Sequence, residues 1–117
     1  MYFYAISRRD LSSEQQAIQA AHAVVEYIRC QNPDLPEHPT FIFLTAADTK
    51  ELVSVYCNLK ACGIKVQSFS DPDFDWGNFT AVAALVPEDQ RFLLSGYPLW
   101  KASPAVKAKV WFRKLLP

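Results

Sequence analysis

Two short apolar runs, each followed by a pattern typical of a capped amphipathic helix, constrain the fold of this chain more than any other feature of its sequence. The runs are YFYAIS at 2–7 and TFIFLTA at 40–46, and both are rich in aromatic and β-branched residues, as strands are. The second run is apolar on both faces, which predicts a central strand covered by helices. The alternation of strand and helix therefore predicts an α/β fold.

The first two predicted helices each begin with a capping pattern. Ser12 is followed three residues later by Gln15, and this S-x-x-Q pattern opens a helix predicted to end near residue 29 or 30. Asp48 and Glu51 repeat the arrangement at the start of a second helix, which Gly63 is expected to end. Local chemistry as well as apolar periodicity thus defines both helices.

The rest of the chain completes a layered architecture. Further strands are predicted at 64–69 and 79–86, and a short helix at 87–94. We expect helices on both faces of a four-stranded mixed sheet, a three-layer α/β/α sandwich that forms one domain over residues 1–100. Residues 101–117 carry five basic residues and no acid, and we expect them to form a basic amphipathic C-terminal helix or tail.

Composition bounds the environment of the protein. The net charge is zero, so no overall field draws the protein to nucleic acid. No run approaches the roughly 18 apolar residues of a membrane span, and we expect a cytoplasmic protein that does not enter a membrane. The three cysteines are an odd number without metal-ligand spacing, so Cys30, Cys57 and Cys62 are expected to be small core residues in a reducing compartment.

A polar stripe runs along the first predicted helix. Gln15, Gln19 and His22 are spaced i, i+4, i+7 and fall on one narrow line, which Glu26 and Arg29 continue. Such a stripe is either a solvated face with local ion pairs or the lining of a site. The residues on the far side of the helix are Ala17, Ala20, Ala21, Val24, Tyr27 and Ile28.

The stripe belongs to a longer pattern that resembles a known family. An Asp-Leu pair ends the first predicted strand at 10–11, and a Gln-x-x-His-Ala sequence follows on the helix at 19–23. The acidic turn SDPDFDWGNFTAVA at 70–83 contains Thr80, which opens the fourth predicted strand. In this order the motifs resemble those of the peptidyl-tRNA hydrolase 2 family, over roughly residues 2–86. The resemblance implies the family's α/β fold.

The chain departs from the family at one position that bears on catalysis. Enzymes of the family carry a Gly-Lys pair at the start of the first helix, and the lysine, seven residues before the histidine, is assigned to their active site. This chain has Glu14 and Gln15 there, and its loop after Asp10 is two residues shorter than in the eukaryotic enzymes. A branch of small bacterial and phage proteins is similar to this chain in its Gln-Gln form and its acidic Pro-containing turn.

The resemblance implies a reaction and a set of roles. The chain is expected to hydrolyse the ester between peptide and tRNA with an activated water, without a metal or a cofactor. His22 would act as general base, because a histidine can change protonation near neutral pH. Gln19 would hold the water or the peptide carbonyl, Asp71 would orient the base and Thr80 would donate its hydroxyl. The residues expected to bind the RNA substrate are Gln15, Asp10, Arg8 and Arg9.

Other functions fit the same residues. The domain could be a catalytically impaired binding module that holds an RNA end or a protein, with hydrolysis lost together with the lysine. It could instead be an interaction domain that forms a homodimer through the apolar side of the C-terminal segment. Gln15 could serve only as a capping residue. Asp71, Asp73 and Asp75 lack the glycine and glutamate of an EF-hand loop, so we expect an ordinary turn there and no metal site.

Overall fold

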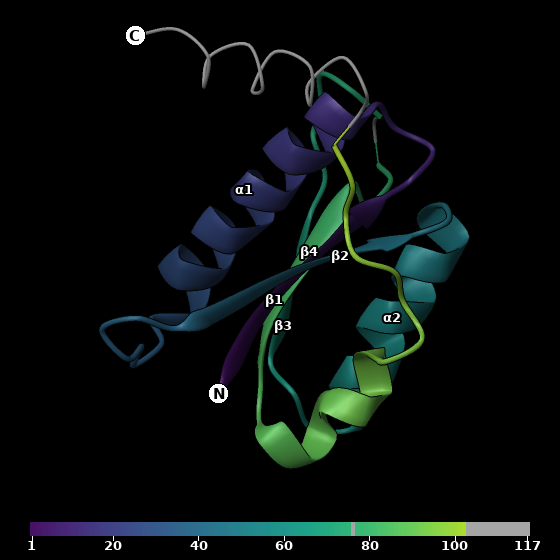
Figure 1. Ribbon diagram of the computed structural model, residues 1–117. Coiled ribbons are helices and arrows are strands. Elements are labelled where there is room, and N and C mark those ends of the chain that lie inside the picture. Colours follow the sequence, from purple (N-terminus) through teal and green to yellow (C-terminus); the bar gives the residue numbers. More distant parts are fainter. Residues whose placement is uncertain (76, 103–117) are drawn as a thin grey trace, which may run out of the picture.

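Four strands, two α-helices and a 3-10 helix make up the part of the chain that the computed structural model describes, residues 1–75 and 77–102 (Figure 1). In chain order they are β1 (Tyr2–Arg8), α1 (Ser13–Gln31), β2 (Thr40–Ala46), α2 (Thr49–Ala61), β3 (Val66–Phe69), β4 (Ala81–Val86) and the 3-10 helix η1 (Glu88–Leu94). From residue 103 onward, the helix or tail expected at 101–117 lies outside the described residues. Within the described ranges, no helix has both the length and the apolar character needed to cross a bilayer.

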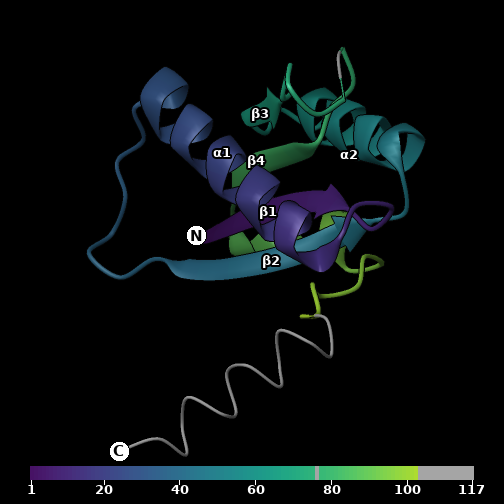
Figure 2. The same ribbon diagram turned by 90° about the horizontal axis from the view of Figure 1, so that it is seen from above.

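The strands form one mixed sheet in the order β2-β1-β4-β3, which can be followed in Figure 2. β1 pairs in parallel with β2 and antiparallel with β4, so that Ile6 of β1 lies between Leu44 and Val82. β3 adds to the far edge of β4 in antiparallel orientation. β1 is therefore a central strand whose neighbours come from two distant parts of the sequence.

The two faces of the sheet bury different side chains, and this division places the helices. Phe3 of β1 packs against Tyr27 of α1, with ring centroids 5.2 Å apart. Tyr4 and Ile6 belong to the core cluster of the opposite face, because successive strand residues point to opposite sides. The α2 side chains in that cluster are Leu52, Val55 and Leu59. The expected three-layer α/β/α arrangement is confirmed, with α1 on one side and α2 on the other (Figure 1).

The expectation that 40–46 is a central strand is wrong, because β2 lies at the edge of the sheet. Its apolar pattern is explained by cover from a later segment. The backbone N–H of Thr45 donates to the Pro98 carbonyl at 2.9 Å, and that of Trp100 donates to the Phe43 carbonyl at 2.9 Å. The Trp100 ring stacks on Phe43 with centroids 5.2 Å apart. The second half of β2 is thereby covered like an interior strand, whereas Phe41 in the first half is 52% exposed.

Both predicted helix caps are present. The Ser12 hydroxyl accepts from the Gln15 N–H at 3.1 Å, and the Asp48 carboxylate accepts from the Glu51 N–H at 2.9 Å. Gly63 follows α2 with a φ of +77°, a left-handed conformation that glycine adopts at little cost. Both helices therefore begin where the capping patterns predict, with the expected capping hydrogen bonds.

The expectation that the three cysteines are core residues is wrong. Cys30, Cys57 and Cys62 are all exposed free thiols. The buried positions of α2 follow the spacing of Leu52, Val55 and Leu59, and Cys57 falls off that line. Apolar character alone did not separate the buried face of α2 from its flanks.

Val55 and Val25 allow the same substitution to be compared inside and outside the core. Val55 is 1% exposed and Val25 on α1 is 60% exposed. Val55→Ala should lower the free energy of unfolding by about 2 kcal/mol, because two buried methyl groups are lost and the cavity is only partly refilled. Val25→Ala should change it by less than about 0.5 kcal/mol. Urea unfolding followed by circular dichroism measures both, and equal losses would contradict this division of the helix faces.

Candidate functional site

The residues of the polar stripe on α1 differ in their burial. Gln19 is 0% exposed and faces the sheet, whereas His22, three residues later, is exposed. Ile28, which the sequence pattern places opposite the stripe, is 44% exposed. The helix can present Gln19 to the interior because both ends of that side chain find hydrogen-bond partners there.

The Gln19 amide bridges two residues that flank the turn between β3 and β4. Its Nε2 donates to Asp71 Oδ2 at 3.1 Å, and its Oε1 accepts from the Thr80 hydroxyl at 2.6 Å. A carboxylate only accepts, so the neighbour Asp71 fixes which end of the amide is which. Nε2 also lies 3.4 Å from Gln15 Oε1. The amide therefore links α1 to both ends of the turn.

Asp71 is held as an ionised carboxylate at the edge of this network. Its Oδ1 accepts from the Asp73 N–H at 3.0 Å, and the pKa of Asp71 is lowered chiefly by the Gln19 hydrogen bond and next by that N–H. The positive form of His22 adds a smaller lowering of the same pKa. Because Asp71 is only partly buried, the remaining lone pairs of its carboxylate face solvent.

The His22 ring is fixed by an aromatic neighbour from the sheet. It stacks on Phe69 with ring centroids 4.6 Å apart and planes 8° from parallel. Phe69 is also the residue whose carbonyl accepts from the Thr80 N–H at 2.8 Å. His22, Asp71, Gln19 and Thr80 are thus brought together on the α1 side of the sheet.

Two of these four residues cannot act in the way that the sequence suggested. Gln19 and Thr80 are both 0% exposed, so neither reaches a substrate directly. Their hydrogen bonds are satisfied by each other and by neighbouring groups, which corrects the expectation that they hold the water or donate to the substrate. Of the four residues, His22 is exposed and Asp71 is partly exposed.

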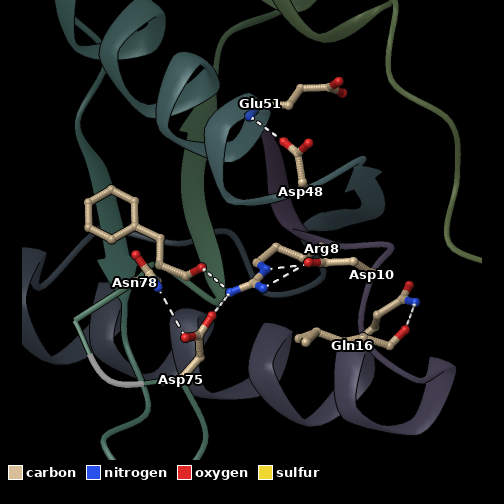
Figure 3. A network of polar contacts seen from close by, with 9 residues as sticks. Arg8, Asp10, Gln16, Asp48, Glu51, Asp75 and Asn78 are labelled. Carbon is tan, nitrogen blue, oxygen red and sulfur yellow. Dashed lines mark hydrogen bonds and ion pairs between the residues drawn. The ribbon is translucent and has the colours of Figure 1, made fainter.

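A second polar network ties the end of β1 to the middle of the same turn (Figure 3). Arg8 donates to both oxygens of Asp10, at 3.0 and 2.8 Å, and on its other side pairs with Asp75 and with the Phe79 carbonyl. Asp75 accepts in addition from the Asn78 amide at 3.0 Å. The Arg8 side chain is 8% exposed, so its charge interacts with these partners and hardly with solvent.

In this network Arg8, which was expected to bind substrate, is nearly buried, whereas the side chain of Asp10 is 42% exposed and its expected role is not tested. The hydrogen bonds from Arg8 are the largest cause of the lowered pKa of both Asp10 and Asp75. The same contacts raise the pKa of Arg8. Sequence reasoning missed Asp75 and Asn78, which are separated from Arg8 by about 70 residues and carry no local signal of this pairing.

Arg9, Gln15 and His22 border solvent in different ways. Arg9 donates from Nη1 to the Thr45 carbonyl at 2.9 Å and lines a pocket at the end of β2. His22 borders a hollow of about 290 Å³, whose other lining residues, Ile18, Ala21 and Val25, are apolar. Gln15 is half-buried, and its backbone N–H serves the Ser12 cap while its side chain meets Gln19. Among the described residues, no three His, Cys, Asp or Glu side chains cluster to hold a metal.

Comparison with protein-family models and with curated proteins finds no match for this chain. The chemical capacity of the site therefore follows from its own side chains. They combine an exposed imidazole, a neighbouring carboxylate held by two donors, and a buried amide that fixes the carboxylate. This combination can accept a proton, stabilise the resulting positive charge and keep its geometry.

Removing the Arg8 charge should make stability less sensitive to acid. Because Asp10 and Asp75 have lowered pKa values in the folded protein, their stabilisation is present above the unfolded pKa of about 4 and is lost as pH falls below it. Arg8→Gln should lower Tm at pH 7 by roughly 5 °C or more. The difference in Tm between Arg8→Gln and the wild type should become smaller as pH falls from about 4 to 2.

Thermal melts from pH 2 to 7 measure this effect. Arg29→Gln is the matched control, because Arg29 pairs with Glu26 on the surface and its side chain is 71% exposed. The control should change Tm little at any pH. A deficit in Arg8→Gln that stays constant over the whole pH range would show that the ion pairs are not its cause.

Thr80→Val should expose the dependence of Asp71 on the buried network. The change keeps the shape of the side chain but leaves Gln19 Oε1 without a donor, at a cost of about 1–3 kcal/mol in the free energy of unfolding. Once Gln19 is less firmly held, the pKa of Asp71, followed by NMR, should rise toward its ordinary value. Thr80→Ser keeps the hydroxyl and should leave that pKa low. The same Asp71 titration in both variants would rule out the proposed coupling.

Proposed function

We propose that this protein hydrolyses the ester that joins a peptide to the 3′ end of tRNA. The observation that carries the proposal is the hydrogen-bonded chain from Asp71 through Gln19 to Thr80, beside the stacked ring of His22. The same residues carry the resemblance to the peptidyl-tRNA hydrolase 2 family. In this proposal the reactive groups are His22 and Asp71, and the buried pair are positioning residues.

The reaction requires one proton to move twice. His22 accepts a proton from a water molecule as that water attacks the ester carbonyl carbon. The imidazolium then gives the proton to the 3′ oxygen of the ribose as the carbon–oxygen bond breaks. This yields a free 3′ hydroxyl and the carboxylic acid of the peptide, which releases its own proton to solvent at neutral pH. Asp71 stabilises the transient positive charge on His22, in keeping with the electrostatic effect of His22 on the pKa of Asp71.

Gln15 supplies a donor where the family has its lysine. Its Oε1 is turned toward Gln19 Nε2 at 3.4 Å, so the NH₂ group of Gln15 lies on the other side of its amide. Gln15 is half-buried, so part of its side chain remains open to solvent and to a bound substrate. A neutral amide donates a hydrogen bond to the developing oxyanion without a full charge, so we expect weaker stabilisation than a lysine gives.

The hollow beside His22 suits the acyl part of the substrate. It is a shallow, open surface on one face of α1, bordered by the exposed side chains of Ile18, Ala21 and Val25. Apolar side chains of a peptide would cover this surface and remove water from around the ester. The proposal therefore favours a substrate with a hydrophobic residue next to the ester.

Peptide release from an N-acetylated aminoacyl-tRNA tests the proposal. His22→Asn should reduce kcat/KM by at least about 100-fold, the usual contribution of a general base. His38→Asn is the matched control, because His38 is the other histidine of the chain and its side chain is 91% exposed. Asp71→Asn should also reduce the rate, whereas Asp73→Asn, in the same turn, should retain it.

Two results would count against hydrolysis. One is a wild-type rate no faster than the spontaneous loss of the ester. The other is an equal effect of the two histidine substitutions. The presence of Gln15 in place of the family's lysine favours a second function in that case, a module that binds an RNA end without turnover. Retention of the tRNA that weakens steeply with salt would then identify it.

A further inference from the structure

A second pocket lies at the carboxyl ends of the parallel strands β1 and β2, and it shares no lining residue with the proposed active site. Its volume is about 260 Å³. Open α/β sheets bind ligands at the carboxyl ends of their parallel strands, where the loops can form a crevice. The residues that line this pocket are Arg9, Gln16, Thr45, Pro98, Leu99 and Lys101.

The charges of the pocket have one sign. Arg9 and Lys101 supply two positive charges, and within the described part of the chain no Asp or Glu lines the pocket. An anion entering the pocket would therefore meet attraction without local competition from a carboxylate in its lining.

Arg9 is held in place before any ligand arrives. Its Nη1 donates to the Thr45 carbonyl at 2.9 Å and lies 3.2 Å from the Thr45 hydroxyl. These contacts use one of the three guanidinium nitrogens, and the remaining donors keep the planar fork that matches phosphate geometry. Because Thr45 is a buried residue of β2, the guanidinium is anchored to the sheet.

The opposite wall is fixed as well. Residues 98–100 are hydrogen-bonded to β2 through the Thr45 N–H and the Phe43 carbonyl. The Trp100 ring nitrogen also donates to the Ser13 carbonyl at 3.1 Å, at the start of α1. Lys101 directly follows Trp100, which is hydrogen-bonded to both the sheet edge and the helix. The pocket is therefore formed by four separate parts of the chain that hold one another.

We propose that this pocket binds a phosphate monoester. At pH 7 a monoester carries a charge of about −1.5 to −2, which matches two cations, whereas a carboxylate or a phosphodiester carries about −1. With a volume of about 260 Å³, the pocket has room for a phosphate and the start of the ester group. The proposal does not depend on hydrolysis at His22.

Calorimetric and NMR titrations with adenosine 5′-monophosphate test the ligand class. Inorganic phosphate and the monophosphate should bind and shift the amide signals of Arg9, Thr45 and Leu99. Adenosine, which lacks the phosphate, should not shift them, and adenosine 3′,5′-cyclic monophosphate, a diester, should bind at least about tenfold more weakly. Equal binding of adenosine and its monophosphate, or shifts confined to other surfaces, would overturn the proposal.

Charge-removing variants locate the site. Arg9→Gln and Lys101→Gln should each weaken binding of the monophosphate at least about tenfold, and Lys101 has no described role in the fold that the substitution would disturb. The matched controls, Arg29→Gln and Lys65→Gln, remove exposed charges elsewhere and should leave binding unchanged. Equal weakening in Lys101→Gln and Lys65→Gln would show a nonspecific charge effect and refute a built site.

A comparison of ligands distinguishes the two natural sources from which the phosphate could come, the end of a nucleic acid or a small metabolite. An oligoribonucleotide with a terminal phosphate should bind more tightly than the same strand ending in a hydroxyl, if the natural ligand is a nucleic-acid end. Equal affinity for the two strands, together with retained binding of the mononucleotide, would assign the pocket to small phosphorylated metabolites. Loss of hydrolysis in His22→Asn with intact phosphate binding would separate this site from the proposed active site.

Discussion

The buried amide of Gln19 is the interaction on which the candidate site depends. Its two ends meet chemically different partners, a carboxylate that accepts and a hydroxyl that donates. In the low dielectric beneath α1, an aliphatic residue here would leave Thr80 and Asp71 without this partner, and a glutamate would place a second negative charge against Asp71. Glutamine satisfies both neighbours at once. A helix–sheet contact that could have been purely apolar is thereby made specific.

The turn that carries Asp71 is held at two places by two different kinds of contact. Gln19 reaches Asp71 from the helix, and Arg8 reaches Asp75 from the end of β1. The first contact is a hydrogen bond from the neutral side-chain amide of Gln19. The second is one of two ion pairs made by the nearly buried guanidinium of Arg8, with Asp10 and with Asp75. Because β1 is central in the sheet and α1 packs on it, both anchors belong to one rigid unit. A loop can present a functional carboxylate accurately when it is restrained in this way.

Local sequence signals predicted the elements well, because caps, strand composition and a helix-ending glycine act over a few residues. Ser12, Asp48 and Gly63 each behave as the sequence indicates. The edge position of β2 was not predictable from its composition, because its cover comes from residues 98–100. The grouping of His22 with Asp71 and Thr80 followed only from a family resemblance. The burial of Gln19 and the capture of Arg8 depend on partners 52 to 67 residues away, which no periodicity reveals.

The central position of β1 affects how the strand can pair while the chain is being synthesised. β1 leaves the ribosome before the other three strands of the sheet, yet its antiparallel pairing with β4 joins Tyr2 to Val86 and Ser7 to Ala81. Until that part of the chain is synthesised, β1 has only β2 beside it and one hydrogen-bonding edge stays open. Such long-range pairing slows folding and lengthens the time for which an apolar strand is unprotected. Early association of α1 with β1 would shield one face of the nascent strand, while its free edge waits for β4.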